Sequence, residues 1–177
     1  MATPAKWVID PTHSEVQFKV KHLVITTVTG QFSQFSGEAT ASDDFSDAQV
    51  HFEAEIDSIS TNNEARDGHL KSEDFFAAEQ HPKLSFVSTG ISKKGDEEFV
   101  LNGDLTIRGV TKPVAFAVEY GGTVVDPYGQ TKAGFEVKGK INRKDYGLTW
   151  SAVTEAGGAV VSDEVRLIAN VQFVKQA

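Results

Sequence analysis

Residues 15–21 read EVQFKVK, in which Val16, Phe18 and Val20 alternate with charged or amide side chains. Successive side chains of a β-strand point to opposite faces, so this stretch predicts a strand with one apolar face and one face in water. The same two-residue period returns along most of the chain. It predicts further strands at residues 50–56, 84–86, 98–108, 114–120, 133–141 and 165–173, and a weaker one at residues 37–41.

Short turn motifs separate these segments. Glycine-containing turns are expected at residues 94–96, 108–109, 121–122, 126–129 and 157–158. The stretch from Arg108 to Pro113 is interpreted as a hairpin turn, because no helix follows it to complete a phosphate-binding loop. About eight antiparallel strands form either a sandwich or an up-and-down barrel, and the periodicity leaves both open. Without a fixed-length repeat or a low-complexity linker, we expect one domain over residues 1–177.

One interval, from Ser60 to Gln80, departs from the two-residue period. Asn63 precedes an acidic first turn, and so does Ser72, and both residue types are favoured as helix N-caps. Two short helices are therefore predicted, the second ending before Pro82. Their apolar residues can face one surface, so we expect residues 62–78 to form a lid.

The net charge and amino-acid composition of the chain exclude several function classes. The 177 residues carry a formal net charge of −8 and no cysteine. The negative charge disfavours nucleic acid as a partner, and the missing thiols exclude disulfides and thiolate metal sites. The five histidines show no metal-ligand spacing, so neither a metal nor a cofactor is expected. The longest apolar run, residues 114–118, is too short to span a bilayer, which predicts no stable membrane insertion. With no signal-like stretch near Met1, a cytoplasmic location is expected, or a periplasmic one if a leader was removed.

The predicted inward faces mix large and small residues. Phenylalanines at positions 18, 52, 86, 116 and 135 stand beside Ala54, Gly103, Ala133, Gly139 and Ala169. A barrel of about eight strands is wide enough to be filled by side chains or to hold a small ligand. The small residues favour the second outcome.

Four successive motifs resemble those of the YceI-like family, in that family's order. They are WVIDPTHSEVQFKVKH at residues 7–22, RDGHLKSEDFFAAEQHPKLSF at 66–86, LNGDLTIRGVTKPVAF at 101–116 and INRKDYGLTW at 141–150. The resemblance implies an all-β, lipocalin-like antiparallel barrel closed at one end by helices. It also implies a homodimer, and an apolar interior that holds a long-chain isoprenoid or quinone-type lipid.

A lipid of this kind can be bound almost entirely through apolar contact, at ~0.8 kcal/mol per buried CH₂ group. Tyr146 and Trp150 are expected near the mouth of the barrel, where amphipathic rings are favoured. The full set of candidate lining residues is Phe18, Val20, Phe32, Phe35, Leu70, Phe75, Phe76, Phe86, Phe116, Phe135, Leu148 and Trp150. The expected function is to bind, carry or sequester the lipid without catalysis.

The charged cluster at residues 66–72 leaves alternatives to simple lipid binding open. Arg66 and His69 either meet the polar head of the lipid or, together with Tyr146, serve an enzyme that acts on that head. A structural interpretation has Ser72 capping the second helix and Asp67 pairing with Lys71 across one turn. A third possibility, a β-sandwich interaction module, predicts a filled interior. We expect His13 to form a hydrogen-bonding pair with Ser14 at the entry to its strand.

Overall fold

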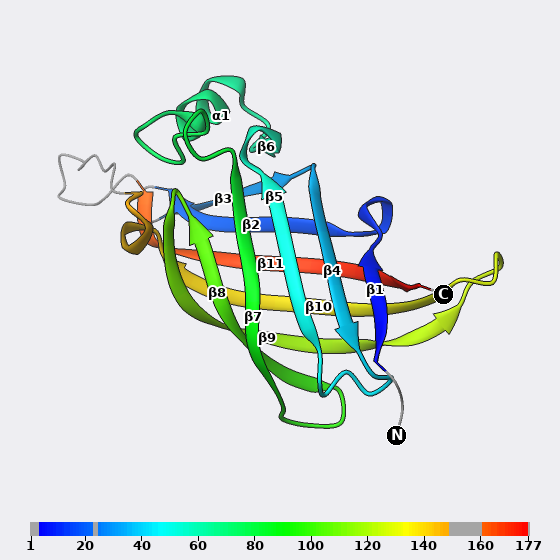
Figure 1. Ribbon diagram of the computed structural model, residues 1–177. Coiled ribbons are helices and arrows are strands. Elements are labelled where there is room, and N and C mark those ends of the chain that lie inside the picture. The colour runs from blue at the N-terminus through cyan, green and yellow to red at the C-terminus, as the bar shows by residue number, and fades with distance from the viewer. Residues whose placement is uncertain (1–3, 23–24, 149–160, 177) are drawn as a thin grey trace.

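The computed structural model describes residues 4–22, 25–148 and 161–176. Most of them lie in one antiparallel sheet (Figure 1). Its strands are β1 (Ala5–Ile9), β2 (Glu15–His22), β3 (Thr26–Phe32), β4 (Phe35–Ala41), β5 (Gln49–Glu55), β6 (Ile59–Ser60), β7 (Lys83–Lys93), β8 (Glu98–Ile107), β9 (Val110–Val125), β10 (Thr131–Asn142) and β11 (Val161–Lys175). The helices are α1 (Glu64–Lys71) and three short 3₁₀ turns, η1 (Pro11–His13), η2 (Ile56–Ser58) and η3 (Arg143–Tyr146).

The sheet closes on itself as a barrel. Around the ring the order is β1, β4, β5, β7, β8, β9, β10 and β11, and β1 then pairs with β11 to complete eight strands. The three remaining strands, β2, β3 and β6, extend this ring. Beyond the end of β1, β2 pairs with β11 on one side and with β3 on the other. Beyond the end of β5, β6 pairs with β3. The predicted antiparallel eight-stranded barrel is therefore confirmed, and the sandwich is excluded.

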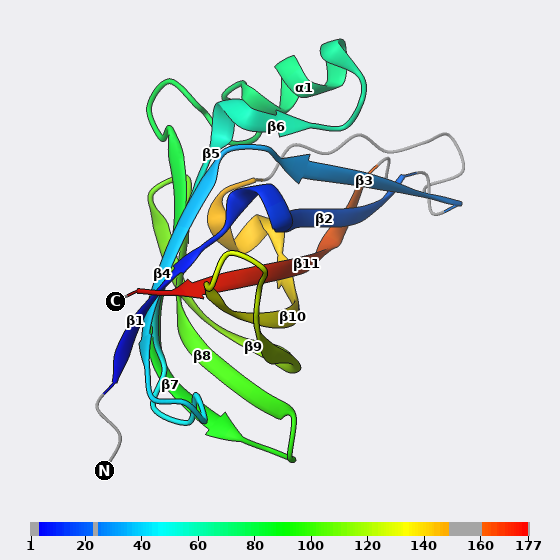
Figure 2. The same ribbon diagram turned by 90° about the vertical axis from the view of Figure 1, so that its right-hand side faces the viewer.

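Two walls of the barrel cross one another. In Figure 1, β4, β5, β7 and β8 run down the front, and β2, β11, β10 and β9 run across behind them. The view in Figure 2 separates the two walls and shows α1 above the gap between them. The hairpin at Arg108 and Gly109 is confirmed: both residues have positive φ, 52° and 75°, as a two-residue hairpin turn of the primed type requires.

The motif Asp10-Pro11-Thr12-His13-Ser14 turns the corner between β1 and β2. The Asp10 amide donates to the Gln172 carbonyl at 2.8 Å, and the Gln172 amide donates to the Ser14 hydroxyl at 2.9 Å, so β11 stays hydrogen-bonded across the break. The expected pairing of His13 with Ser14 is wrong. The His13 ring bonds the Asp10 carboxylate at 2.8 Å instead, because the 3₁₀ turn η1 brings positions three apart together.

These contacts set the ionisation of Asp10. Hydrogen bonds from His13 and then from Thr12 hold the pKa of this carboxyl far below its ordinary value. A group with a lowered pKa in the folded state adds stability above its unfolded pKa of about 4, and that stability is lost as the pH falls further.

We therefore expect Asp10→Asn to flatten the acid limb of the stability curve. The wild-type protein should lose on the order of 2 kcal/mol more unfolding free energy than the variant between pH 5 and pH 2. Urea unfolding at several pH values measures the difference. Parallel acid limbs for the two proteins would contradict the assignment.

Aromatic rings fill the spaces above strand glycines. A Cβ atom built on Gly139 would lie 2.4 Å from the Phe116 ring, and one on Gly103 would lie 2.4 Å from the Phe86 ring. Gly30 lies under the ring of its cross-strand partner Phe18 in the same way. The expectation that small inward residues leave room for a ligand is thus wrong for Gly103 and Gly139, whose space is taken by neighbouring rings.

The two glycines of β10 provide a matched test of this packing. Gly139→Ala is expected to lower the free energy of unfolding by about 1–3 kcal/mol, because the added methyl group displaces the Phe116 ring. A Cβ on Gly134 of the same strand meets nothing within 4 Å, so Gly134→Ala should change stability by less than ~0.5 kcal/mol. Chemical denaturation measures both, and equal effects would contradict the packing argument.

The segment after β6 contains one helix where two were predicted. Asn63 caps α1 as expected, accepting a hydrogen bond from the Arg66 amide at 3.0 Å. Ser72, however, is the C-cap of α1 and does not begin a second helix. The chain turns back there, with the Phe76 amide bonded to the Leu70 carbonyl and Ala77 at a positive φ of 49°. Among the described residues, no helix has the length and apolar character to cross a membrane.

Candidate functional site

The barrel encloses an apolar cavity of about 190 Å³. All eight strands of the closed ring contribute to its lining, together with Phe45 and Ala48 from the loop between β4 and β5. Gln17 is the sole amide among the lining residues that the structure describes, and none of them carries a charge. The cavity can therefore hold apolar groups by contact, and it offers no ion pair to a charged one.

Four of the candidate residues predicted from sequence line this cavity: Phe32, Phe86, Phe116 and Phe135. Phe18 packs at a tilted angle against Phe32, with 5.8 Å between ring centroids. The other predicted positions lie in the wall or at its ends. Val20 is half-buried on β2, and Phe35 of β4 packs against Phe52 at 6.1 Å. Trp150 lies outside the described residues.

The lid segment, residues 62–78, covers the end of the barrel at the top of Figure 1. Phe75 is buried, and the ring of Phe76 meets Phe32 edge-on with 6.4 Å between centroids, while Leu70 is half-buried against the core. The Arg108 guanidinium ties the segment down by donating to the Phe75 carbonyl at 2.9 Å and to the Gly147 carbonyl at 3.1 Å. These contacts fit the role of a cap predicted for this segment.

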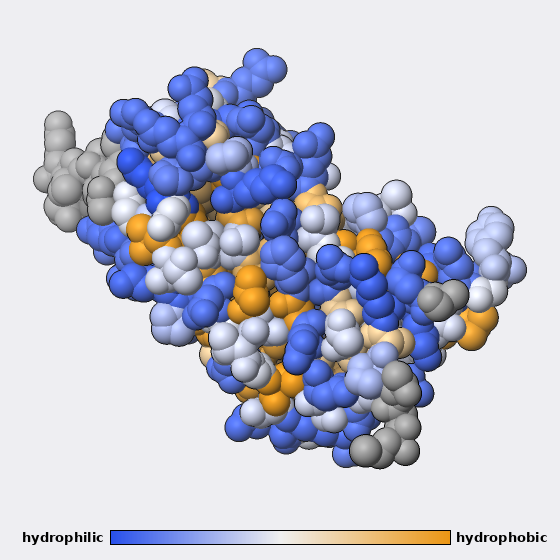
Figure 3. Space-filling model, viewed as in Figure 1, coloured by the Kyte–Doolittle hydropathy of each residue, from blue (hydrophilic) through white to orange (hydrophobic). Residues whose placement is uncertain are grey.

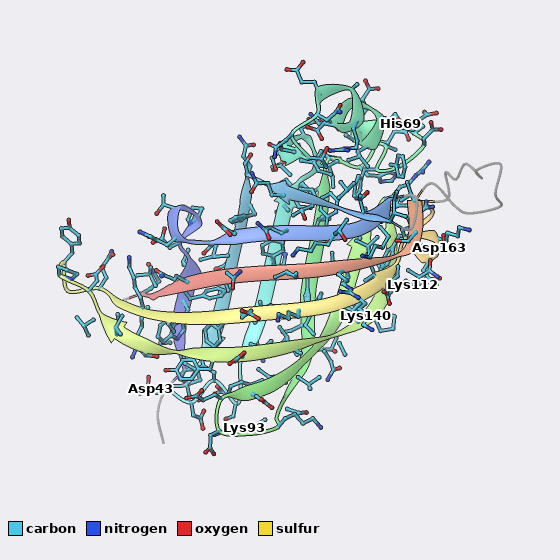
Figure 4. All side chains as sticks on the ribbon, turned by 180° about the vertical axis from the view of Figure 1, so that it is seen from behind. Asp43, His69, Lys93, Lys112, Lys140 and Asp163 are labelled. Carbon is cyan, nitrogen blue, oxygen red and sulfur yellow. The ribbon has the colours of Figure 1, made fainter. Side chains whose placement is uncertain are left out.

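The polar residues of the lid bond to each other and to nearby backbone. The Asp67 carboxylate accepts from the amide and hydroxyl of Thr61 at 2.8 and 2.6 Å, whereas pairing with Lys71 was expected. The Arg66 guanidinium donates to the hydroxyl and carbonyl of Thr61, both at 2.7 Å. His69, labelled in Figure 4, bonds Asp74 at 2.8 Å. The cluster thus organises the start of the lid.

Within the described ranges, no group of three or more histidine, aspartate or glutamate side chains could hold a metal ion.

Tyr146 and Leu148 belong to the turn that follows β10, and both are buried. Arg143, also buried, holds this turn to β11 by donating to the carbonyls of Leu148 at 2.6 Å, Ser162 at 3.0 Å and Val161 at 3.3 Å. Tyr146 was expected at the mouth of the barrel, but its side chain is only 2% exposed. Burial, with a smaller contribution from Asp145, raises the pKa of Tyr146 to about 12.

The burial of Tyr146 predicts a late titration step. A raised pKa in the folded state favours the neutral phenol, so the stability it contributes is present below the unfolded pKa of about 10 and is lost as the pH rises through 12. In an ultraviolet absorbance titration, one of the chain's three tyrosines should ionise about two pH units after an ordinary tyrosine. Tyr146→Phe should remove that late step, and a step that survives the substitution would contradict the assignment.

Phe45 fills the end of the cavity away from the lid. This residue has a positive φ of 60° and lies 5.2 Å from Trp7 and 5.0 Å from Phe135, measured between ring centroids. Sequence reasoning missed both Phe45 and Trp7. Phe45 stands in the loop SDDFSDA, which has no strand period, and the short strand β1 around Trp7 shows no clear alternation.

A more polar groove of about 560 Å³ runs outside the wall over β4, β5 and β7. The ladder between β5 and β7 ends at His51 and Val87, and beyond it the Val50 amide donates to the Ser88 hydroxyl at 2.7 Å. Hydrophobic side chains show between polar ones on this face of the molecule (Figure 3). The residues that line both the groove and the cavity are Ala39, Ala48, Val50 and Ile91. The wall is therefore thin here.

The fold and the site define a single-sheet antiparallel β-barrel with an apolar cavity, a lid at one end and an aromatic residue at the other. The chain belongs to the YceI-like family, whose domain model matches residues 7–173. This finding confirms the resemblance carried by the four sequence motifs.

Relatives match along nearly the whole chain. A UPF0312 protein of Staphylococcus epidermidis is 38% identical over 170 residues, which cover 95% of this chain and 96% of that protein. The crystal structure of a Campylobacter jejuni YceI protein is 31% identical, with a TM-score of 0.77 over 89% of this chain and 90% of that one. A domain from Saccharophagus degradans shares the fold at 14% identity, with a TM-score of 0.67 over 98% of this chain and 99% of that one.

Proposed function

We propose that this protein binds a long-chain isoprenoid or quinone-type lipid inside the barrel, as a single domain and without catalysis. The observation that carries the proposal is the cavity, which is lined by apolar side chains from every strand of the ring and by no charged residue among those described. Such a surface recognises a ligand by the apolar area that both bury. A lipid chain is the ligand class with that property.

The size of the cavity sets how such a lipid fits. About 190 Å³ is less than the ~300 Å³ at the lower end of usual small-molecule pockets. Only a short part of the tail therefore enters without rearrangement, and a longer tail requires side chains at one end to move. The rings that would have to move are Phe45, which lines one end of the cavity, and Phe76 at the other end, which packs edge-on against the lining ring of Phe32. At ~0.8 kcal/mol per buried CH₂ group, a few five-carbon units are sufficient for stable binding.

A structural neighbour supports this class of ligand. The Saccharophagus degradans structure is that of a polyisoprenoid binding domain. At 14% identity the likeness shows a shared fold, and the apolar lining of the present cavity is what makes the same ligand class suitable for this chain.

The polar residues favour a carrier or sequestering role over the enzyme alternative. Arg66 and Asp67 both bond Thr61, His69 bonds Asp74, and Tyr146 is buried in another turn. An acid–base pair needs groups aimed at a shared substrate position, and these groups are directed at neighbours in the protein. A homodimeric state belongs to the same proposal, on the family resemblance.

Extraction of the purified protein tests the proposal directly. The protein is denatured, extracted with organic solvent and analysed by mass spectrometry, and the emptied protein is then titrated with prenyl lipids. An isoprenoid or quinone in the extract, or micromolar binding of an added prenyl lipid, is the expected result. A lipid-free extract together with no binding of any added prenyl lipid would overturn the proposal.

A variant that fills the cavity tests where the lipid binds. Ala169 lines the cavity on β11, and Ala169→Phe places a ring there, so the affinity for an added prenyl lipid should fall about tenfold or more. Ala117 is exposed on β9, and Ala117→Phe adds the same group without entering the cavity. Circular dichroism checks that both variants fold. Equal affinities of the two variants would place the lipid elsewhere.

A further inference from the structure

Trp7 has an unusual polar atom. Its side chain is 2% exposed, and its indole Nε1 is the one buried side-chain nitrogen or oxygen without a hydrogen-bond partner among the described residues. Leaving such a donor unpaired costs about 1–3 kcal/mol, which is why nearly all buried polar groups in proteins are paired. The position of this donor therefore calls for a physical explanation.

The donor belongs to a residue of the cavity wall. Trp7 lines the cavity, and its ring packs against Phe45, with 5.2 Å between centroids. On β4 its direct partner is Ala39, which lines both the cavity and the outer groove. Trp7 thus lies at the end of the cavity away from the lid, beside the thin part of the wall.

We propose that Trp7 Nε1–H is the polar recognition point of the cavity and donates a hydrogen bond to an uncharged oxygen on the head of the bound lipid. The inference rests on the proposed function and names the head group: a carbonyl or hydroxyl oxygen on an isoprenoid tail. One neutral donor satisfies one such oxygen, and the rest of the lining, apart from the half-buried Gln17 of β2, is apolar and matches the tail.

The surrounding charges argue against an anionic head at this end. A buried diphosphate needs cations, and the described lining residues of the cavity supply none. Lys175 lies 5.9 Å from the Trp7 ring centroid, but its ammonium group is paired with Asp43 at 3.3 Å. The groove outside the thin wall carries the carboxylates of Glu38 and Asp47, which repel phosphate. A neutral oxygen meets neither obstacle.

Four probes with the same branched carbon skeleton separate the contribution of the head from that of the tail. Farnesol carries a hydroxyl, farnesal a carbonyl and farnesyl diphosphate an anionic head, whereas 2,6,10-trimethyldodecane carries no polar atom. The hydrocarbon has no oxygen, so its binding to the cavity does not depend on a hydrogen bond from Trp7. A failure of all four probes to bind refutes the proposed function and this inference together, and binding of the hydrocarbon isolates the test of the head group.

The indole N–H resonance gives a direct readout. The chain has two tryptophans, so ¹⁵N-labelled protein shows at most two indole peaks, and Trp7→Phe identifies the one that belongs to Trp7. Farnesol and farnesal are expected to move the Trp7 indole proton downfield, and the hydrocarbon is not. A Trp7 peak that responds alike to the alcohol and the hydrocarbon, although both bind, would overturn the inference.

Affinities give a second, independent readout. In Trp7→Phe the ratio of farnesal affinity to hydrocarbon affinity should fall about fivefold to tenfold, which corresponds to the loss of one buried hydrogen bond. Phe135→Leu trims a lining ring without removing an N–H, so it should weaken both probes and keep their ratio. In the wild-type protein, farnesyl diphosphate should bind at least about tenfold more weakly than farnesol. An unchanged ratio of farnesal affinity to hydrocarbon affinity in Trp7→Phe would refute the proposal, and so would tighter binding of farnesyl diphosphate than of farnesol to the wild-type protein.

Discussion

Closure of the sheet is the constraint on which the rest of the structure depends. The edge of an open sheet leaves a row of backbone amides and carbonyls unpaired, and a barrel pairs them by joining the first strand to the last. Here the closing ladder is short, because β11 shares its free edge between β1 and β2. The corner at Asp10 to Ser14 makes this sharing possible, since Gln172 stays bonded on both sides of it.

The positions of the strand glycines determine how much of the enclosed interior the protein's own aromatic rings occupy. Gly30, Gly103 and Gly139 each lie beneath a phenylalanine ring, which keeps those rings close to the wall. The rings still point inward, so they narrow the cavity to about 190 Å³. Aromatic rings rotate and shift more easily than backbone moves, and the lining is therefore the part of the barrel best able to yield to a lipid tail.

The fold could be predicted from sequence where one face of a strand is wet and the other is buried. Alternation around Phe18, Phe52 and Phe116 located β2, β5 and β9 because each side of the wall dictates a residue type. The two-residue period does not reveal β1 and β3, because these strands are short or carry few apolar residues. The choice of a barrel over a sandwich was predicted from the family motifs and not from the period.

The second lid helix was predicted wrongly because Ser72 suits either end of a helix, and tertiary contacts selected the C-cap. The lining residues Trp7 and Phe45 depend on which strand and loop meet across the barrel, and no local pattern reports that.

The distribution of polar groups separates two tasks within the barrel. At the lid, the polar side chains of Arg66, Asp67 and His69 are satisfied by neighbours, so they hold the cap in place. For a lipid bound as proposed, the apolar wall inside the barrel supplies affinity in proportion to the buried tail and distinguishes little between tails that fit equally well. A single buried donor, by contrast, discriminates sharply between ligands that do and do not satisfy it. For a lipid bound as proposed, the tail therefore determines how tightly it is held, and the proposed hydrogen bond from the Trp7 indole determines which head group is accepted.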